Sequence, residues 1–264
     1  MSQRRVHRSR STGVVLLCVL AAACVPEDSH KLATYEIRPR FSVLATGDGK
    51  TQVTARLIAP DPDGFFDDDV RLDDHDRLFV TRIDPVDGAE RRKLLHRRPG
   101  PVYQDTFTGD AQDTTFVIEF DRSRTGWTSA PDSHVTLPPA LDLRWVEDLD
   151  TGSPAPTPFS RSSPTPLYVV WDPFEAPDFH PGDVLRFLVT GTCIQAYQGI
   201  VDWAGGESAL DLTGVLVERP APNDGSCPIR VELSVSRRGS VDAAYRGGSF
   251  VATQQRTLQL DSEP

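Results

Sequence analysis

The segment IRVELSV, residues 229–235, decides the fold class that the sequence predicts. Every second side chain in it is apolar: Ile229, Val231, Leu233 and Val235. A period of two is typical of a β-strand that buries one face. The segment VLRFLVT, residues 184–190, has the same alternation. The sequence therefore predicts two core strands in the C-terminal half of the chain.

Two cysteines lie on the buried faces of these strands. Cys193 continues the apolar face of the first strand, and Cys227 stands two residues before Ile229 on the apolar face of the second. If both segments are strands, both thiols point into one core. A metal site of two thiols would need a nearby CxxC or clustered His, and neither is present. We predict a Cys193–Cys227 disulfide, which contributes about 2–4 kcal/mol in the chain-entropy model.

Shorter alternating segments, separated by turns, fill the rest of the chain. The expected strands are 35–44, 51–58, 77–83, 102–107, 114–120, 135–137, 141–149, 167–171 and 249–260. Residues 141–149 also suit a helical turn, and we prefer a strand because a proline pair precedes them. The 22 prolines and 19 glycines indicate a loop-rich chain without long helices.

The spacing of these strands divides the chain in two. A strand, an Arg-rich turn and a second strand follow one another at 120–135 and again at 235–251. About seven short strands in each half resemble immunoglobulin-like or fibronectin-like sandwiches. The resemblance implies an all-β fold of two tandem immunoglobulin-like β-sandwich domains, 33–140 and 141–264. The second domain carries a Pro-rich loop at 151–166.

Residues 1–23 have the three parts of a secretory signal. Four arginines come first, followed by the apolar run 14–20 and by three alanines. A helix that spans a membrane needs roughly 20 apolar residues, and this run is about half as long. We therefore expect the segment to direct export and to be removed.

The end of this signal, Leu20-Ala-Ala-Ala-Cys24, resembles the lipobox of bacterial lipoproteins. The resemblance implies a diacylglyceryl group on the Cys24 thiol, cleavage before Cys24, and an acyl chain such as palmitate on the new N-terminus. Ordinary cleavage after Ala23, with a free Cys24 thiol, is the alternative. The expected protein is anchored in the cell envelope, with the outer membrane or periplasmic face favoured over the inner membrane. Residues 24–32 would form a polar tether.

The chain is acidic. After the signal it has 24 basic and 38 acidic residues, a net charge of −14. An acidic surface repels phosphate backbones and anionic lipid headgroups. We expect no nucleic-acid partner, and we expect attachment to the membrane through the lipid.

Residues 61–76, DPDGFFDDDVRLDDHD, hold eight aspartates. Calcium takes six to eight oxygen ligands, and loops between sandwich strands often supply them. The candidate ligands are Asp61, Asp63, Asp67 and Asp69. The EF-hand pattern fails, because Phe65 occupies its third ligand position and no Glu closes the loop. A solvated acidic loop is the favoured interpretation, so no cofactor is expected, and calcium binding is the alternative.

No motif for catalysis is present in the sequence. It contains no GxSxG, no HExxH and no Gly-rich phosphate loop with Lys, and its six His are scattered. The favoured function is a non-enzymatic binding or structural module. A calcium-dependent module or a hydrolase that uses residues 61–76 is the alternative.

Three aromatic residues stand in expected loops at strand ends: Trp127, Tyr197 and Trp203. Exposed aromatic rings often form the centre of a binding surface. The alternative is that each Trp covers the end of a core. The expected partner is another envelope protein or a polysaccharide.

Overall fold

The computed structural model describes residues 26–60, 67–162, 165–172, 179–202, 209–213, 216 and 225–264. In this part of the chain the protein is built from β-strands that pack as sandwiches, so the predicted all-β class is confirmed. Two 3₁₀ turns near the N-terminus, η1 (Ser29–Lys31) and η2 (Thr34–Glu36), are the helical elements described. No described helix is long and apolar enough to cross a membrane.

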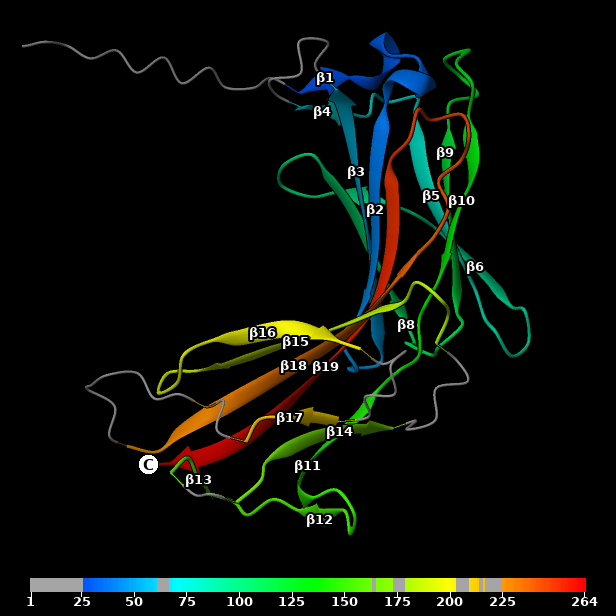
Figure 1. Ribbon diagram of the computed structural model, residues 1–264. Coiled ribbons are helices and arrows are strands. Elements are labelled where there is room, and N and C mark those ends of the chain that lie inside the picture. The colour runs from blue at the N-terminus through cyan, green and yellow to red at the C-terminus, as the bar shows by residue number, and fades with distance from the viewer. Residues whose placement is uncertain are drawn as a thin grey trace, which may run out of the picture.

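The largest sheet runs the length of the molecule (Figure 1). Its strands follow in the order β1 (Glu27–Asp28), β4 (Asp67–Arg71), β3 (Lys50–Pro60), β2 (Arg38–Ala45), β19 (Ser249–Glu263), β18 (Cys227–Arg238), β15 (Val184–Gly191) and β16 (Tyr197–Val201). Three more strands join it off this path: β8 (Val102–Thr108) beside β3, β7 (His96–Arg97) beside β8, and β13 (Phe159–Ser160) beside β19.

Two four-stranded sheets pack against the large sheet. Each closes one hydrophobic core, and the two cores lie at different ends of the large sheet. The first has the order β10 (Ala130–Thr136), β9 (Thr115–Asp121), β5 (Arg77–Ile83) and β6 (Glu90–Leu94). The second has the order β12 (Ser153–Pro154), β11 (Asp142–Asp148), β14 (Tyr168–Asp172) and β17 (Ala209–Asp211). Apolar side chains from every second position of the facing strands fill each core.

Aromatic rings dominate the first core. Phe41 meets Phe250 edge to face at 5.4 Å between ring centroids, and Phe107 meets Phe116 in the same way at 5.7 Å. Edge-to-face contacts add to the free energy that burial of the rings provides. The first core is therefore anchored by β2, β8, β9 and β19.

The second core contains the predicted disulfide. Cys193 and Cys227 are bonded, with their Cα atoms 6.2 Å apart, and the prediction is confirmed. Trp171 is buried in the same cluster as the two cysteines. The bond closes the end of the sandwich where β18 begins.

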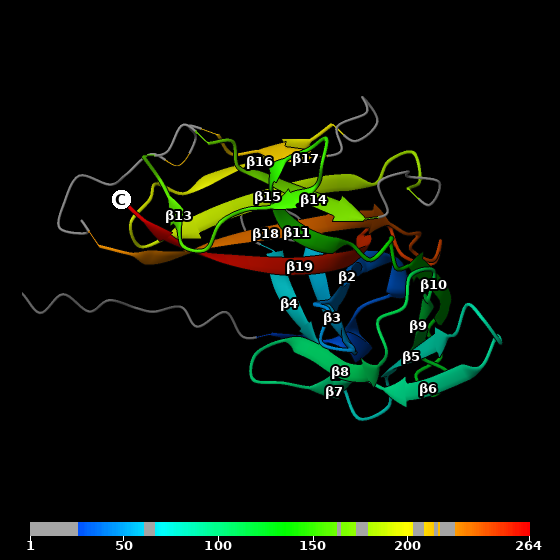
Figure 2. The same cartoon turned by 90° about the horizontal axis from the view of Figure 1, so that it is seen from below.

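The hairpin of β18 and β19 connects the two cores. β18 pairs with β19 over all 12 of its residues, and the start of β19 also pairs in parallel with β2. Phe250 and Ala252 therefore lie in the first core, whereas Leu260 lies in the second. Figures 1 and 2 show these two long strands running side by side from one core to the other. The domain boundary expected at residue 140 stays a prediction.

The sequence predicts a polar tether over residues 24–32, and the structure differs from this prediction. From Glu27 onward the segment is folded: β1 pairs in parallel with β4, and Ser29 is fully buried. The strand expected at 35–44 begins later, at Arg38, because Tyr35 lies in η2. Contacts with distant residues, described below, hold the segment in place.

The acidic segment also differs from the expected loop. Residues Asp67–Arg71 form strand β4, in which Asp69 stands opposite Ile58 of β3. Arg56 of β3 and Arg40 of β2 offset the repulsion between the aspartates, so that an extended acidic strand is stable here.

Candidate binding surface

A buried arginine fixes the N-terminal segment to the first core. Arg122, at the end of β9, is fully buried, and its guanidinium donates to the Asp76 carboxylate at 3.1 Å. It also donates to the carbonyls of Ser29 at 2.7 Å and Leu32 at 2.9 Å, and to the hydroxyl of Thr34 at 3.2 Å. The planar guanidinium can satisfy acceptors on several sides at once. This cluster connects the segment from Ser29 to Thr34 to the first core.

Trp127 covers this same segment. The side chain is 39% exposed, and its Nε1 donates to the His30 carbonyl at 3.0 Å. The Arg122 guanidinium lies 5.8 Å from the Trp127 ring centroid. The indole nitrogen of Trp127 therefore helps to hold η1 in place. This agrees with the alternative interpretation, in which the Trp covers the end of a core.

The two described aspartates of the calcium candidate are paired with arginines. Asp67 lies 3.2 Å from Arg40, and Asp69 lies 2.6 Å from Arg56. Within the described ranges, no three His, Cys, Asp or Glu residues are grouped so that they could hold a metal ion. Asp61 and Asp63 lie outside the described residues.

The end of the acidic segment is a turn. The Asp73 carboxylate accepts hydrogen bonds from the backbone N–H groups of His75 at 2.8 Å and Asp76 at 2.9 Å. Burial opposes ionisation of Asp73, but these two hydrogen bonds outweigh it and lower the pKa of the carboxyl below its ordinary value. Asp73 therefore stabilises the turn, which agrees with the favoured interpretation of the segment as a solvated acidic loop.

A serine, a histidine and an aspartate meet between β10 and the end of β18. The Ser240 hydroxyl lies 3.2 Å from both ring nitrogens of His134, and Asp132 lies 3.2 Å from Nδ1. A hydroxyl equally distant from both nitrogens sits over the ring face rather than on the lone pair of one nitrogen. Activation of a serine requires an in-plane hydrogen bond to one nitrogen while the carboxylate holds the other. These exposed residues therefore do not form a catalytic triad.

Tyr197, which was expected in a loop, lies instead on β16, the terminal strand of the large sheet, because residues 197–201 pair with β15. It is 40% exposed, and its ring packs against Phe187 at 5.1 Å between centroids. Trp127 contacts His30, next to β1, whereas Tyr197 lies on β16 at the other end of the strand order, so the structure does not bring them together. Figure 1 shows β1 and β16 far apart. Trp203 lies outside the described residues, as does the lipidation candidate Cys24.

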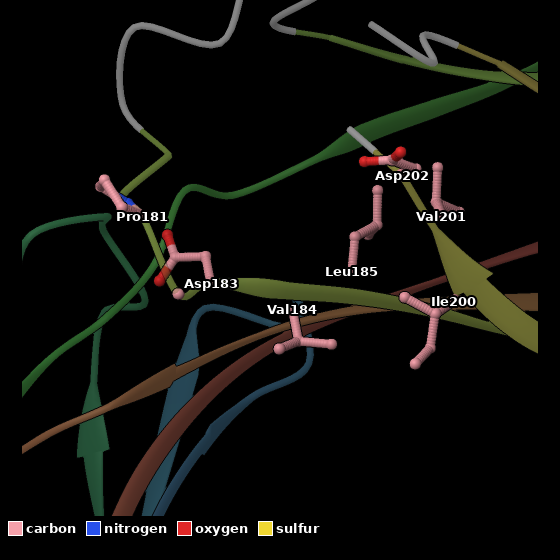
Figure 3. Close-up of a pocket in the computed structure, with 8 residues that line it drawn as sticks. Pro181, Asp183, Val184, Leu185, Ile200, Val201 and Asp202 are labelled. Atoms are coloured by element: carbon pink, nitrogen blue, oxygen red, sulfur yellow. The ribbon is translucent and has the colours of Figure 1, made fainter. Parts of the chain in front are cut away.

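A hollow of about 580 Å³ lies beside β16. Its apolar wall is formed by residues of β15 and β16 and by one proline: Val184, Leu185, Ile200, Val201 and Pro181. Gly182, Asp183 and Asp202 complete the lining. Figure 3 shows Val184 and Ile200 pointing to the same side of the two strands. Ile200 is 66% exposed, although isoleucine is usually buried. This surface was not predicted from the sequence, in which the uncharged segment 197–201 is its signal.

Comparisons with known proteins find similarity of fold at most. No protein-family model matches the sequence, and no curated protein matches it. The chain can be superposed on the crystal structure of chicken CNTN1 FN1-FN3 domains with a TM-score of 0.28, 9% identity, and coverage of 90% of this chain and 68% of that one. A tetra-tandem repeat in the extending region of a large adhesion protein gives a TM-score of 0.22, 14% identity, and coverage of 85% and 50%. These values are too low to transfer a function.

Proposed function

We propose that this protein is a lipid-anchored module of the bacterial cell envelope that binds another envelope protein or a polysaccharide and catalyses no reaction. One observation carries the proposal: β1, where the described N-terminal segment begins, and β16, which lies beside the apolar hollow, are the two terminal strands of one continuous sheet (Figure 1). An anchor close to β1 would leave β16, the terminal strand on the other side of the sheet, accessible to a partner.

The short connection to the anchor supports this arrangement. Only two residues separate Cys24 from Glu27, where β1 begins. Three residue steps reach at most roughly 11 Å in a fully extended chain. If Cys24 carries lipid, the end of the fold that contains β1 therefore stays close to the bilayer.

The contacts of the acidic strand support a binding module over a calcium-dependent module or a hydrolase. Asp67 and Asp69 are each within ion-pair distance of an arginine. A calcium ion, or the substrate of a hydrolase, would have to displace those guanidinium groups from the two carboxylates.

Fractionation of cells tests the anchor. Cys24→Ala should release the protein from the membrane, and mass spectrometry of the unaltered protein should find lipid on an N-terminal Cys24. Cys18→Ala is the matched control, because this cysteine lies in the segment expected to be removed, and it should leave the attachment unchanged. Recovery of the unaltered protein, unmodified and wholly in the soluble periplasmic fraction, would contradict the proposal.

A further inference from the structure

β16 ends the large sheet with one edge uncovered by any described strand. Its inner edge pairs antiparallel with β15, from Leu185 opposite Val201 to Val189 opposite Tyr197. In the part of the chain that the structure describes, no strand pairs with its outer edge. Such an edge presents backbone N–H and C=O groups to whatever extended chain comes near.

The other terminal strands carry features that block this kind of pairing. β6 has the sequence ERRKL, with four charged side chains in five residues. β10 contains Pro131 and Asp132, and its register shifts at that point. β1, β12 and β17 have only two or three residues. Charge, proline, irregularity and shortness all prevent a sheet from adding a further strand at its edge.

β16 has none of these features. Its sequence is YQGIV, five residues without charge or proline. The exposed Ile200 stands on this strand, and the hollow beside it is formed by Ile200 and Val201 together with Val184 and Leu185 of β15 (Figure 3). An edge strand next to an apolar hollow has both parts of a site for strand addition: the backbone supplies affinity and the hollow selects a side chain.

We propose that β16 binds an extended segment of a partner protein as an additional β-strand, with an apolar side chain of that segment in the hollow. This inference rests on the proposed function and narrows the partner to a protein. The backbone groups along an edge are complementary to another polypeptide backbone rather than to a polysaccharide.

A second copy of this chain is a less suitable occupant. The chain after the signal has a net charge of −14, so two copies repel each other. A partner protein without this negative charge would meet an uncharged strand and no such repulsion. The proposed partner segment is at least five residues long and has apolar side chains at alternate positions, as β15 has on the inner side of β16.

Selection of peptides tests the proposal with lipid-free protein. The probe is a phage-displayed library of random eight-residue peptides, selected on purified protein with Cys24→Ser and then synthesised for measurement of Kd. We expect the selected peptides to alternate apolar residues and to slow hydrogen exchange at the amides of residues 197–201. Ile200→Lys should weaken binding at least tenfold, because it puts a charge on the edge.

Val86→Lys is the matched control. Val86 is 92% exposed in a turn of the first sandwich, so the same kind of change should leave Kd within twofold. Thermal melting checks that both variants fold. Failure to select peptides, equal binding to Ile200→Lys, or protection elsewhere would overturn the proposal. A concentration-dependent dimer in sedimentation that Ile200→Lys abolishes would also overturn it, in favour of a second copy. None of these results depends on lipidation, so the anchor is tested separately by fractionation.

Discussion

The guanidinium of Arg237 binds both carboxylate oxygens of Asp183, at 3.0 Å from Nε and 2.9 Å from Nη2, and both side chains are buried. Arg237 lies near the end of β18, and Asp183 directly precedes β15 in the second sandwich. The same guanidinium donates to the hydroxyl of Thr136 at 3.3 Å and to the carbonyl of Leu137 at 3.4 Å, both at the end of β10 in the first sandwich. One arginine thus connects the two cores at the point where they meet.

Loss of this arginine should destabilise the protein strongly. Arg237→Ala leaves the Asp183 carboxylate buried without its guanidinium, and we expect the free energy of unfolding to fall by about 3–5 kcal/mol. Urea denaturation followed by circular dichroism measures the change. Arg230→Ala on the same strand is the control, because its contact with Glu232 is exposed and 3.7 Å long. Arg230→Ala should lower the free energy of unfolding by less than about 1 kcal/mol. Equal effects of the two substitutions would contradict the prediction.

Arg122 should govern the attachment of the N-terminal segment. Without its hydrogen bonds to Ser29 and Leu32, η1 loses its main connection to the core. We expect Arg122→Ala to accelerate tryptic cleavage after Lys31 at least tenfold, measured by mass spectrometry of timed digests at native pH. Arg124→Ala, an exposed neighbour, should leave the rate unchanged. An unchanged rate in Arg122→Ala would show that other contacts hold the segment.

Tyr245 offers a change that should stabilise the fold. Its ring stacks on Phe120 in the first core, but its buried hydroxyl finds no hydrogen-bond partner among the described residues. Burial raises the pKa of this phenol well above its ordinary value. Because an unsatisfied buried hydroxyl costs about 1–3 kcal/mol, Tyr245→Phe should raise the free energy of unfolding by about 1 kcal/mol.

The matched change at Tyr103 should have the opposite sign. The buried Tyr103 hydroxyl accepts a hydrogen bond from the Leu72 amide at 2.7 Å. Tyr103→Phe would leave that amide unsatisfied and should lower the free energy of unfolding by about 1 kcal/mol. Destabilisation by both changes in the same denaturation experiment would mean that the Tyr245 hydroxyl has a partner, such as water.

Calcium should have no specific effect on stability. The arginines beside Asp67 and Asp69 already offset their charge, so millimolar calcium should shift the melting temperature no more than sodium at equal ionic strength. A bound ion would instead stabilise the fold by a free energy that rises with the logarithm of the ion concentration. A calcium-specific rise that Asp67→Asn with Asp69→Asn abolishes would establish the acidic segment as a metal site and contradict this expectation.

The sequence alone was enough to predict several core strands and the faces that they bury. The alternation in residues 77–83, 184–190 and 229–235 was sufficient, because the two faces of a strand are set by consecutive residues. The same pattern placed Cys193 and Cys227 on inward faces, and the disulfide follows from that placement.

Only the tertiary structure decided how distant segments meet. Arg122 finds Asp76 across 46 residues, and Arg237 finds Asp183 across 54, and neither partner is marked by any local pattern. Asp67–Arg71 forms a strand because it pairs with the end of β3, while Arg40 and Arg56 offset the charge of two of its aspartates. Whether a strand such as β16 ends a sheet also depends on which other strands pair with it. Alternation specifies the faces of a strand, whereas its edges are specified by the packing of the whole chain.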